Sequence, residues 1–337
     1  ASQALILFVF GKRMGLSFKF NFSWRGVGLG PAMRTASWTL GMLIVTQIGG
    51  IVQTAVASRA IQGRELLVDN QLAIASVAAM SIAWLIFMLP HSVATVSIAT
   101  AYFTKMSTHV HENRMDLLKA DLAAGLRSIA LISVLATIAI SVLAYPISRV
   151  FVGEFAAIIS LGNVIVALML GLLPFSFVYM MQRAFFALED TRTPFWFTAV
   201  QIGLHIIGSI SISLTVPAEW LVVALSLLTS TTITIQAVLA YWLLTKRIGS
   251  FKQHGIATAC AKFVVSGVLA GLIGYAILQL LGGVVAGSFV VAKVASAGLS
   301  MVIAGGVMLA IYVIALRLLR VKEVDTVFSA IKGIVRR

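Results

Sequence analysis

The chain has 337 residues, of which 60% are hydrophobic and only 11% charged, and its formal net charge is +14. Soluble domains carry about 25% charged residues, so a single soluble core is excluded as the place for this much apolar surface. The excess of Lys and Arg does not indicate nucleic-acid binding, because these residues are dispersed between apolar runs. The composition indicates a protein that works inside a membrane.

Residues 1–10 form a short apolar stub that precedes a basic segment at 11–30. Ten residues are too few to cross a bilayer, whose hydrocarbon core needs about 20. Because the chain begins with Ala1, we predict that the stub is the end of a transmembrane helix whose beginning is absent. Residues 11–30 are predicted to be a cytoplasmic linker.

Eight further runs of 21 residues or more contain no Asp, Glu, Lys or Arg. Each run is long enough to span the membrane as a helix. The predicted fold class is therefore all-α, a polytopic transmembrane helical bundle. In chain order the runs are residues 35–58, 70–104, 128–148, 155–182, 193–218, 220–245, 263–292 and 294–316.

Polar residues recur at helical spacing within several runs. Polar groups in hydrocarbon are costly unless they face partners or water, so these stripes are expected to point inward. They are Thr39, Gln47, Gly50, Thr54 and Ser58; Ser81, Trp84, Met88, His91 and Thr95; Thr198, Gln201, His205 and Ser209; and Thr229, Thr232 and Gln236. Hydrogen bonds between helices explain the hydroxyl residues. For Gln47, Gln53, His91, Gln201 and His205, a role in lining a cavity competes with that explanation.

Proline and glycine residues occur within several of the runs. Pro90 and Pro174 lie within apolar runs and predict kinks, which serve either bending or packing. A GxxxG pair occupies the seventh run and more glycines the eighth, at positions Gly267, Gly271, Gly298, Gly305 and Gly306. Small residues let helices approach closely. The alternative is a shallow groove that admits a lipid chain.

Basic residues alternate from loop to loop. Alternate loops hold 21 of the 25 Lys and Arg residues, and cytoplasmic loops carry such an excess. We therefore predict eight helices with a cytoplasmic C-terminus, including a basic tail at 321–337. The rich loops are residues 11–34, 105–127, 183–192 and 246–262, and the tail beyond 316.

Residues that carry known catalytic chemistry are missing from the runs. All eleven acidic residues lie outside them, and no phosphate loop, HExxH or GxSxG motif occurs. The single Cys260 excludes an internal disulfide, and two histidines at 109 and 111 are insufficient for a metal site. We expect no catalytic residue, metal or cofactor, and favour a passive scaffold or a conformationally driven carrier.

Residues 183–194 read Arg-Ala-Phe-Phe-Ala-Leu-Glu-Asp-Thr-Arg-Thr-Pro. This segment resembles the cytoplasmic signature of the bacterial lipid II flippase family (MurJ, also called MviN), which has an aromatic pair, an Asp and a closing Thr-Pro in this loop. Segments at 30–54, 89–100 and 125–127 agree with the family in order and spacing. The resemblance covers about the whole chain.

The resemblance implies two six-helix lobes plus a final helix pair. Residues 31–248 would form the second lobe, and residues 256–320 the last two helices, which in the family border a groove for the lipid tail. Members carry lipid-linked peptidoglycan precursor from the inner to the outer leaflet of the bacterial cytoplasmic membrane by alternating access. This chain departs from the family in having no Arg shortly before Leu89, and neutral Ser209 and Ser213 where some members have a proposed sodium-binding carboxylate.

The expected partners are lipid II or a similar polyprenyl-diphosphate glycan, membrane lipids and cell-wall synthesis proteins, with no nucleic acid. In this half the substrate cavity would be lined by Gln47, Gln53, His91, Gln201 and His205. Arg183 and Arg192 would guide the anionic headgroup at the cytoplasmic mouth; topology and lipid phosphate contact are the alternative for these two. Two other functions stay open: an exporter of another polyprenyl-linked glycan or a drug, and a non-transporting scaffold for cell-wall enzymes.

Overall fold

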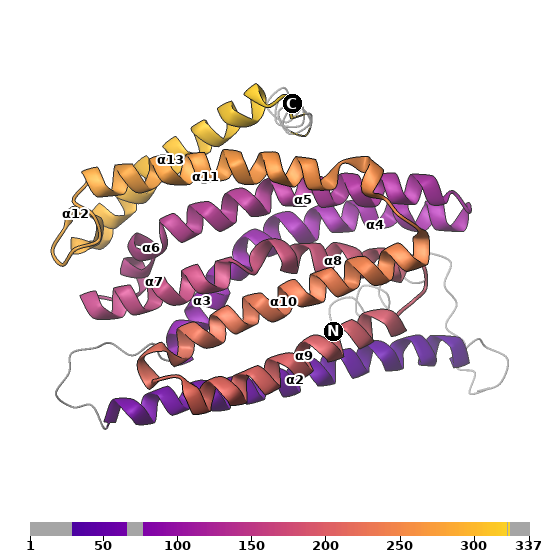
Figure 1. Ribbon diagram of the computed structural model, residues 1–337, viewed down its shortest axis with the longest axis horizontal. Coiled ribbons are helices and arrows are strands. Elements are labelled where there is room, and N and C mark those ends of the chain that lie inside the picture. Colours follow the sequence, from indigo (N-terminus) through magenta and orange to yellow (C-terminus); the bar gives the residue numbers. More distant parts are fainter. Residues whose placement is uncertain (1–28, 66–76, 322, 324–337) are drawn as a thin grey trace, which may run out of the picture. The chain divides into compact units, whose positions relative to one another are not determined.

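The computed structural model describes residues 29–65, 77–321 and 323. Contacts divide the chain into residues 1–37, of which only the first residues of α2 are described, and residues 38–337. Every regular element in the described ranges is helical, which confirms the all-α class (Figure 1). The predicted helix end at 1–10 and nearly all of the linker at 11–30 and the tail at 321–337 lie outside the described residues.

The helices follow one another with short connections. Within the described residues, eight helical spans are long and apolar enough to cross a membrane, as the charge-free runs predict. The elements are α2 (Leu29–Glu65), α3 (Val77–Pro90), η1 (His91–Thr95), α4 (Val96–His111), α5 (Met115–Val142), α6 (Ala144–Phe151), α7 (Phe155–Met169), α8 (Leu172–Ala187), α9 (Arg192–Thr215), α10 (Ala218–Ile248), η2 (Lys252–His254), α11 (Ile256–Leu280), α12 (Phe289–Ala292) and α13 (Val294–Leu318).

The seventh span differs from its charge-free run of 263–292. Helix α11 begins at Ile256, before Lys262, and ends at Leu280. It stops there because Gly282 and Gly283 adopt positive φ angles of 107° and 66°, which side chains disfavour and which break the helical path. The apolar residues that follow form a turn and the short helix α12 instead.

Both prolines in the runs lie beside helix irregularities. Pro90 ends α3, and the next five residues form the π-helical turn η1, in which the Val96 N–H bonds to the His91 carbonyl. The fourth span breaks between α7 and α8, three residues before Pro174. At this break the Ser230 hydroxyl lies 2.7 Å from the Ala167 carbonyl oxygen and 3.1 Å from that of Leu168. A side chain from α10 thus bonds to the Ala167 carbonyl beside the break, while the Leu168 carbonyl also accepts the Gly171 N–H at 3.0 Å.

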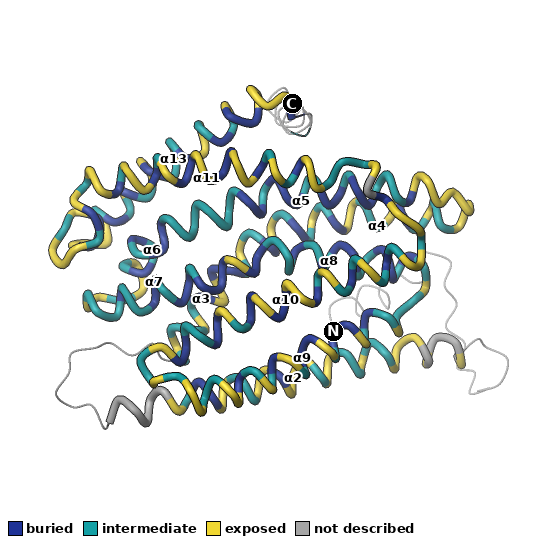
Figure 2. The backbone as a smooth tube through the Cα atoms, in the orientation of Figure 1, coloured by how far each residue is buried: buried dark blue, intermediate teal, exposed yellow. Residues whose placement is uncertain are grey.

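Helix α5 links α11 and α13 to the rest of the bundle. It packs against α4 and α8 on one side and against α11 on the other, and α11 packs in turn against α13. Figure 2 shows buried residues along α5, α8 and α10, while α11 and α13 carry many exposed ones. At the α5–α13 contact the Tyr312 hydroxyl donates to the Leu131 carbonyl at 2.8 Å, within an apolar cluster.

The GxxxG pair of α11 is a packing surface. A Cβ atom added at Gly267 or Gly271 would lie 2.5 or 2.6 Å from Ile138 of α5. This surface therefore leaves no room for a lipid chain. On α13, by contrast, Gly298 and Gly306 have nothing within 4 Å of an added Cβ.

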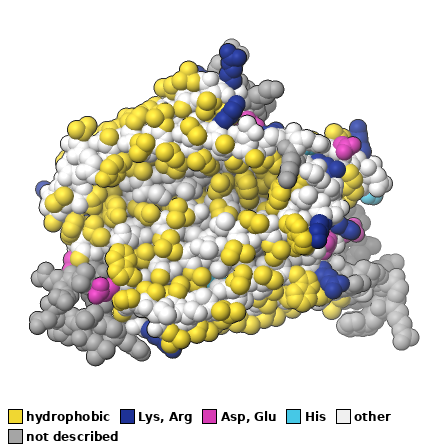
Figure 3. All heavy atoms as spheres, viewed as in Figure 1, with side chains coloured by type: hydrophobic (Ala, Val, Ile, Leu, Met, Phe, Trp, Pro, Cys, Tyr) yellow, Lys and Arg dark blue, Asp and Glu magenta, His cyan; other side chains and the backbone are white. Residues whose placement is uncertain are grey.

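Basic side chains gather at one end of the helices. The α4–α5 turn, the α8–α9 loop and the α10–α11 connection lie at the right of Figure 1, whereas α6, α12 and the α9–α10 turn lie at the left. In Figure 3 most visible Lys and Arg side chains occupy the right end and hydrophobic side chains the face between. The basic residues that alternate from loop to loop along the sequence thus gather at one end of the helices in the structure.

Replacing Gly267 and Gly271 together by Ala should lower the midpoint of thermal unfolding in detergent. The two methyl groups would meet the same Ile138 side chain, which is stiff at χ1 and cannot withdraw from both. Overpacking of this kind costs about 1–3 kcal/mol. The matched control is Gly298→Ala with Gly306→Ala, which should leave the midpoint unchanged or slightly raised. Equal effects of the two pairs would contradict the packing.

Candidate functional site

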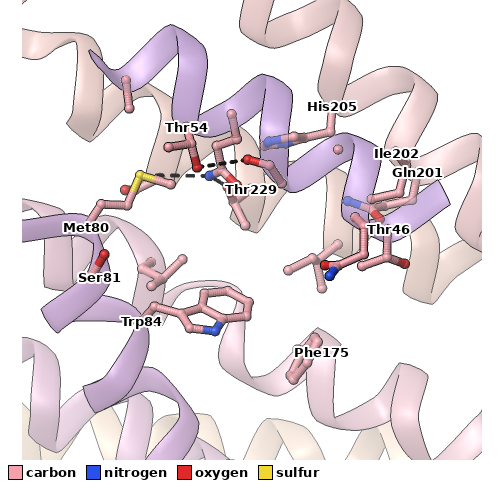
Figure 4. A pocket seen from close by; sticks show the side chains of 18 of the residues that line it. Thr46, Thr54, Met80, Ser81, Trp84, Phe175, Gln201, Ile202, His205 and Thr229 are labelled. Carbon is pink, nitrogen blue, oxygen red and sulfur yellow. Dashed lines mark hydrogen bonds between the residues drawn. The ribbon is translucent and has the colours of Figure 1, made fainter. Parts of the chain in front are cut away.

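A pocket of about 620 Å³ opens among α2, α3, α9 and α10. The break between α7 and α8 contributes Leu168 and Phe175 to its wall. Figure 4 shows the Trp84 and Phe175 rings across the pocket from His205, Gln201 and Thr229. The polar lining residues are Thr46, Gln47, Gln53, Thr54, Ser81, Gln201, His205, Ser226, Thr229 and Gln236.

The pocket lies near the middle of most of the spans that form it, whereas α3 contributes residues from the beginning of the span Val77–His111. Gln47 occupies the centre of the span Thr35–Arg59, and Gln201 and His205 lie inside Arg192–Thr215. Polar side chains that line a cavity at this depth are costly unless water or a ligand fills it. Its volume falls within the range of about 300–1,000 Å³ that is usual for ligand sites.

Glutamine–threonine hydrogen bonds tie the walls of the pocket together. Gln53 of α2 donates to Thr229 of α10 at 3.1 Å. Gln201 of α9 donates to Thr232 of α10 at 3.2 Å, and Gln236 of α10 donates back to Thr198 of α9 at 3.1 Å. These bonds hold the polar stripes of three helices together, as expected for interhelical hydrogen bonding.

His205 is the least satisfied polar group in the pocket. Its side chain is 3% exposed, and neither ring nitrogen has a hydrogen-bond partner within the described part of the chain. A buried imidazole without partners loses hydrogen bonds that it makes in water. The ring borders the pocket, but both of its nitrogens are buried in the wall.

Four of the five predicted cavity residues line this pocket: Gln47, Gln53, Gln201 and His205. Whether they contact substrate stays a prediction. His91 is the exception, because it is not among the lining residues. Its ring is 5% exposed, and its Nδ1 lies 3.3 Å from the Ser176 hydroxyl, behind Phe175, whose ring centroid is 4.5 Å away.

The Phe175 ring explains why His91 does not reach the pocket, because this ring lies against the imidazole and itself lines the cavity. The stripe predicted from regular α-helical spacing is correct for Ser81, Trp84 and Met88, which line the pocket. After Pro90 the chain enters η1, whose wider i→i+5 turn changes the face on which later residues lie. His91 and Thr95 instead share Ser176 of α8 as a partner.

Several lining residues have no individual signal in the sequence. Phe175 resembles a lipid-facing or core residue, and Ser226 resembles any other helix serine. Trp84, by contrast, belongs to the inward stripe predicted on the second run, and Thr229 and Gln236 belong to the one predicted on the sixth. Phe175 reaches the pocket because the chain breaks at Leu170–Gly171, which periodicity does not reveal.

The two mouth arginines lie outside the pocket, near the α8–α9 loop. Arg183 donates to the Tyr179 hydroxyl, and its guanidinium lies over the rings of Tyr179 and Phe103, at 4.8 and 5.8 Å from their centroids. Arg192 is exposed and lies 5.7 Å from the Trp38 ring centroid. Of the two, Arg192 is the more accessible to an anion.

Comparison with known proteins relates the chain to one family. A family model described as "Lipid II flippase MurJ" matches residues 1–296. A solved structure titled "Lipid II flippase MurJ, inward closed conformation" is similar, with a TM-score of 0.62 and 18% sequence identity. The alignment covers 94% of this chain and 60% of that one, so the chain spans well under two thirds of the length of the matched protein. At this identity the structural likeness concerns the fold.

A cysteine introduced at Gln47 should react with a charged, membrane-impermeant maleimide in a Cys260→Ser background. Gln47 is exposed in the pocket, where water can hydrate the thiolate, which is the form of cysteine that reacts with a maleimide. Ser176→Cys, at a position with no exposed surface behind the pocket wall, is the control and should stay unlabelled. Equal labelling of both positions would show that the pocket wall is not closed there.

Proposed function

Because the chain belongs to the MurJ family of lipid II flippases, we propose that the protein moves lipid II, a polyprenyl-diphosphate glycan, from the inner to the outer leaflet of the membrane. The single structural observation that carries this proposal is the polar pocket at mid-depth between apolar spans. A polar headgroup cannot cross hydrocarbon unaided. A cavity at this depth offers it a path while the lipid tail remains in the bilayer.

Residues 31–248 would act as one six-helix lobe of the transporter, with the pocket in its inner wall. The helices α11 and α13, within residues 256–320, would support that lobe through the tight contact of Gly267 and Gly271 with α5. In alternating access, two lobes rock about a central site. The irregular turn η1 and the break between α7 and α8 both lie beside the pocket, where helices can bend at modest cost.

Arg192 would provide the first contact for the anionic headgroup at the cytoplasmic mouth. It is exposed at the basic end of the helices, beside Trp38. Arg183, held by Tyr179 and Phe103, would act mainly by positioning that aromatic cluster. An arginine fork suits phosphate oxygens better than a lysine does.

The membrane would be the bacterial cytoplasmic membrane, with the basic end of the bundle and the C-terminus on the cytoplasmic side. Lipid II and the surrounding lipids would be the partners of the spans. Contacts with cell-wall synthesis proteins would involve the exposed ends of the bundle.

Transport should slow by at least about tenfold when Gln47, Gln53, Gln201 and His205 are all replaced by Ala, because the loss of several hydrogen bonds to a polar substrate accumulates. The measurement is translocation of fluorescent lipid II in proteoliposomes, with protein produced from the complete reading frame. The control replaces Ser97, Thr100, Thr104 and Thr108 of α4, which bond only to their own helix. Wild-type transport by the pocket variant would refute the cavity assignment.

A fluorescent protein fused after Arg337 should be fluorescent in cells, since the proposed topology leaves that end in the cytoplasm. Alkaline phosphatase inserted into the α11–α12 turn, at 284–286, should be active, because that turn lies at the opposite end of the bundle. The reverse result for both reporters would invert the proposed orientation without affecting the fold.

A further inference from the structure

The serine and threonine hydroxyl groups that line the pocket all make the same kind of hydrogen bond. All five Ser and Thr hydroxyls in its lining donate to the carbonyl four residues earlier in their own helix, at 2.8–3.0 Å. The donors are Thr46, Thr54, Ser81, Ser226 and Thr229, and the acceptors are Met42, Gly50, Val77, Val222 and Leu225. A hydroxyl has one hydrogen, so each of these oxygens faces the pocket with its lone pairs only.

The same reasoning fixes which end of each glutamine amide faces α10, because a hydroxyl that has already donated its one hydrogen can only accept. Thr229 and Thr232 donate to the carbonyls of Leu225 and Thr229, so each hydroxyl must accept from the glutamine that contacts it. The amide nitrogens of Gln53 and Gln201 therefore point to α10. Their carbonyl oxygens, which have no hydrogen-bond partner in the described ranges, add further acceptors.

Charge is absent from the lining of this pocket within the described residues: it contains no Lys, Arg, Asp or Glu. The remaining donors are neutral: the free amide N–H groups, the indole of Trp84 and one ring N–H of His205. A diphosphate has only acceptor oxygens and carries negative charge. A diphosphate that entered the pocket would lose its hydration without finding a cation to pair with. Its oxygens would also face the lone pairs of the lining oxygens.

We propose that this pocket binds the uncharged part of the headgroup, the glycan with its hydroxyl and amide N–H groups, and leaves the diphosphate to cationic groups outside the pocket. Sugar hydroxyls and N-acetyl amides can donate to the acceptor oxygens of the lining. The rings of Trp84 and Phe175 offer apolar faces for the sugar ring on the opposite wall. The assignment rests on the proposed function and specifies which part of the substrate this half recognises.

Two probes separate the parts of the headgroup: an N-acetylated amino-sugar disaccharide without diphosphate or lipid, and a polyprenyl diphosphate without sugar. Binding of each to the purified protein in nanodiscs is measured by saturation-transfer NMR and by competition with fluorescent lipid II. The test variant, Thr46→Val with Thr54→Val, removes two acceptor oxygens and keeps the side-chain shape. The control, Thr100→Val with Thr108→Val, removes two hydroxyls that are likewise exposed and bonded to their own helix, on α4 and outside the pocket.

The test variant should bind the disaccharide roughly tenfold more weakly than the wild type, with unchanged affinity for the polyprenyl diphosphate. The control should match the wild type for both probes. Loss of diphosphate binding in the test variant, or no disaccharide binding by a wild type that transports lipid II, would overturn the assignment and leave the proposed function intact. Sodium binding that depends on these two threonines, without an effect on the disaccharide, would also overturn it. A wild type that transports no lipid II would instead refute the proposed function.

Discussion

The scarcity of water in hydrocarbon is the constraint on which the rest of this structure depends. Each polar group within the spans must find a partner inside the protein or face a filled cavity. Many serine and threonine hydroxyls meet this condition locally by bonding to their own helices. Where the backbone itself is interrupted, as between α7 and α8, Ser230 of α10 donates to the Ala167 carbonyl. His205, with neither nitrogen bonded, is therefore notable at the wall of the pocket.

The same local bonding gives the pocket its chemical character. A hydroxyl that donates to its own helix is harmless in an apolar bundle, but beside a cavity it becomes a pure acceptor. Five such oxygens and the oriented glutamine carbonyls make a neutral surface rich in lone pairs. Positive charge lies elsewhere, at the ends of the helices, where Arg192 is exposed and Arg183 is held by aromatic rings. Recognition of glycan and of phosphate would thus be separated along the path of the substrate.

Glycine packing and helix irregularities divide the bundle into stiff and deformable regions. The contact of Gly267 and Gly271 with Ile138 is too close for even one added methyl group without rearrangement, so α11 and α5 should move together. The π-turn η1 and the α7–α8 break lie on the other side of α5, next to the pocket. Bending concentrated there would reshape the pocket while leaving the α5–α11 contact intact.

The sequence by itself determined the fold class, the eight spans and the inward direction of Gln47, Gln53, Gln201 and His205, because hydrocarbon penalises charge and exposed polarity at every position. Its alternating charges also anticipated that basic groups share one end of the bundle. Only the tertiary structure decided that His91 lies behind Phe175, that α11 ends at Leu280, and that Gly267 and Gly271 pack against Ile138 of α5. These outcomes depend on the position of the Phe175 ring, on two positive φ angles and on the position of one Ile side chain. Regular periodicity assumes an unbroken helix and carries no information about the neighbour that a given face meets.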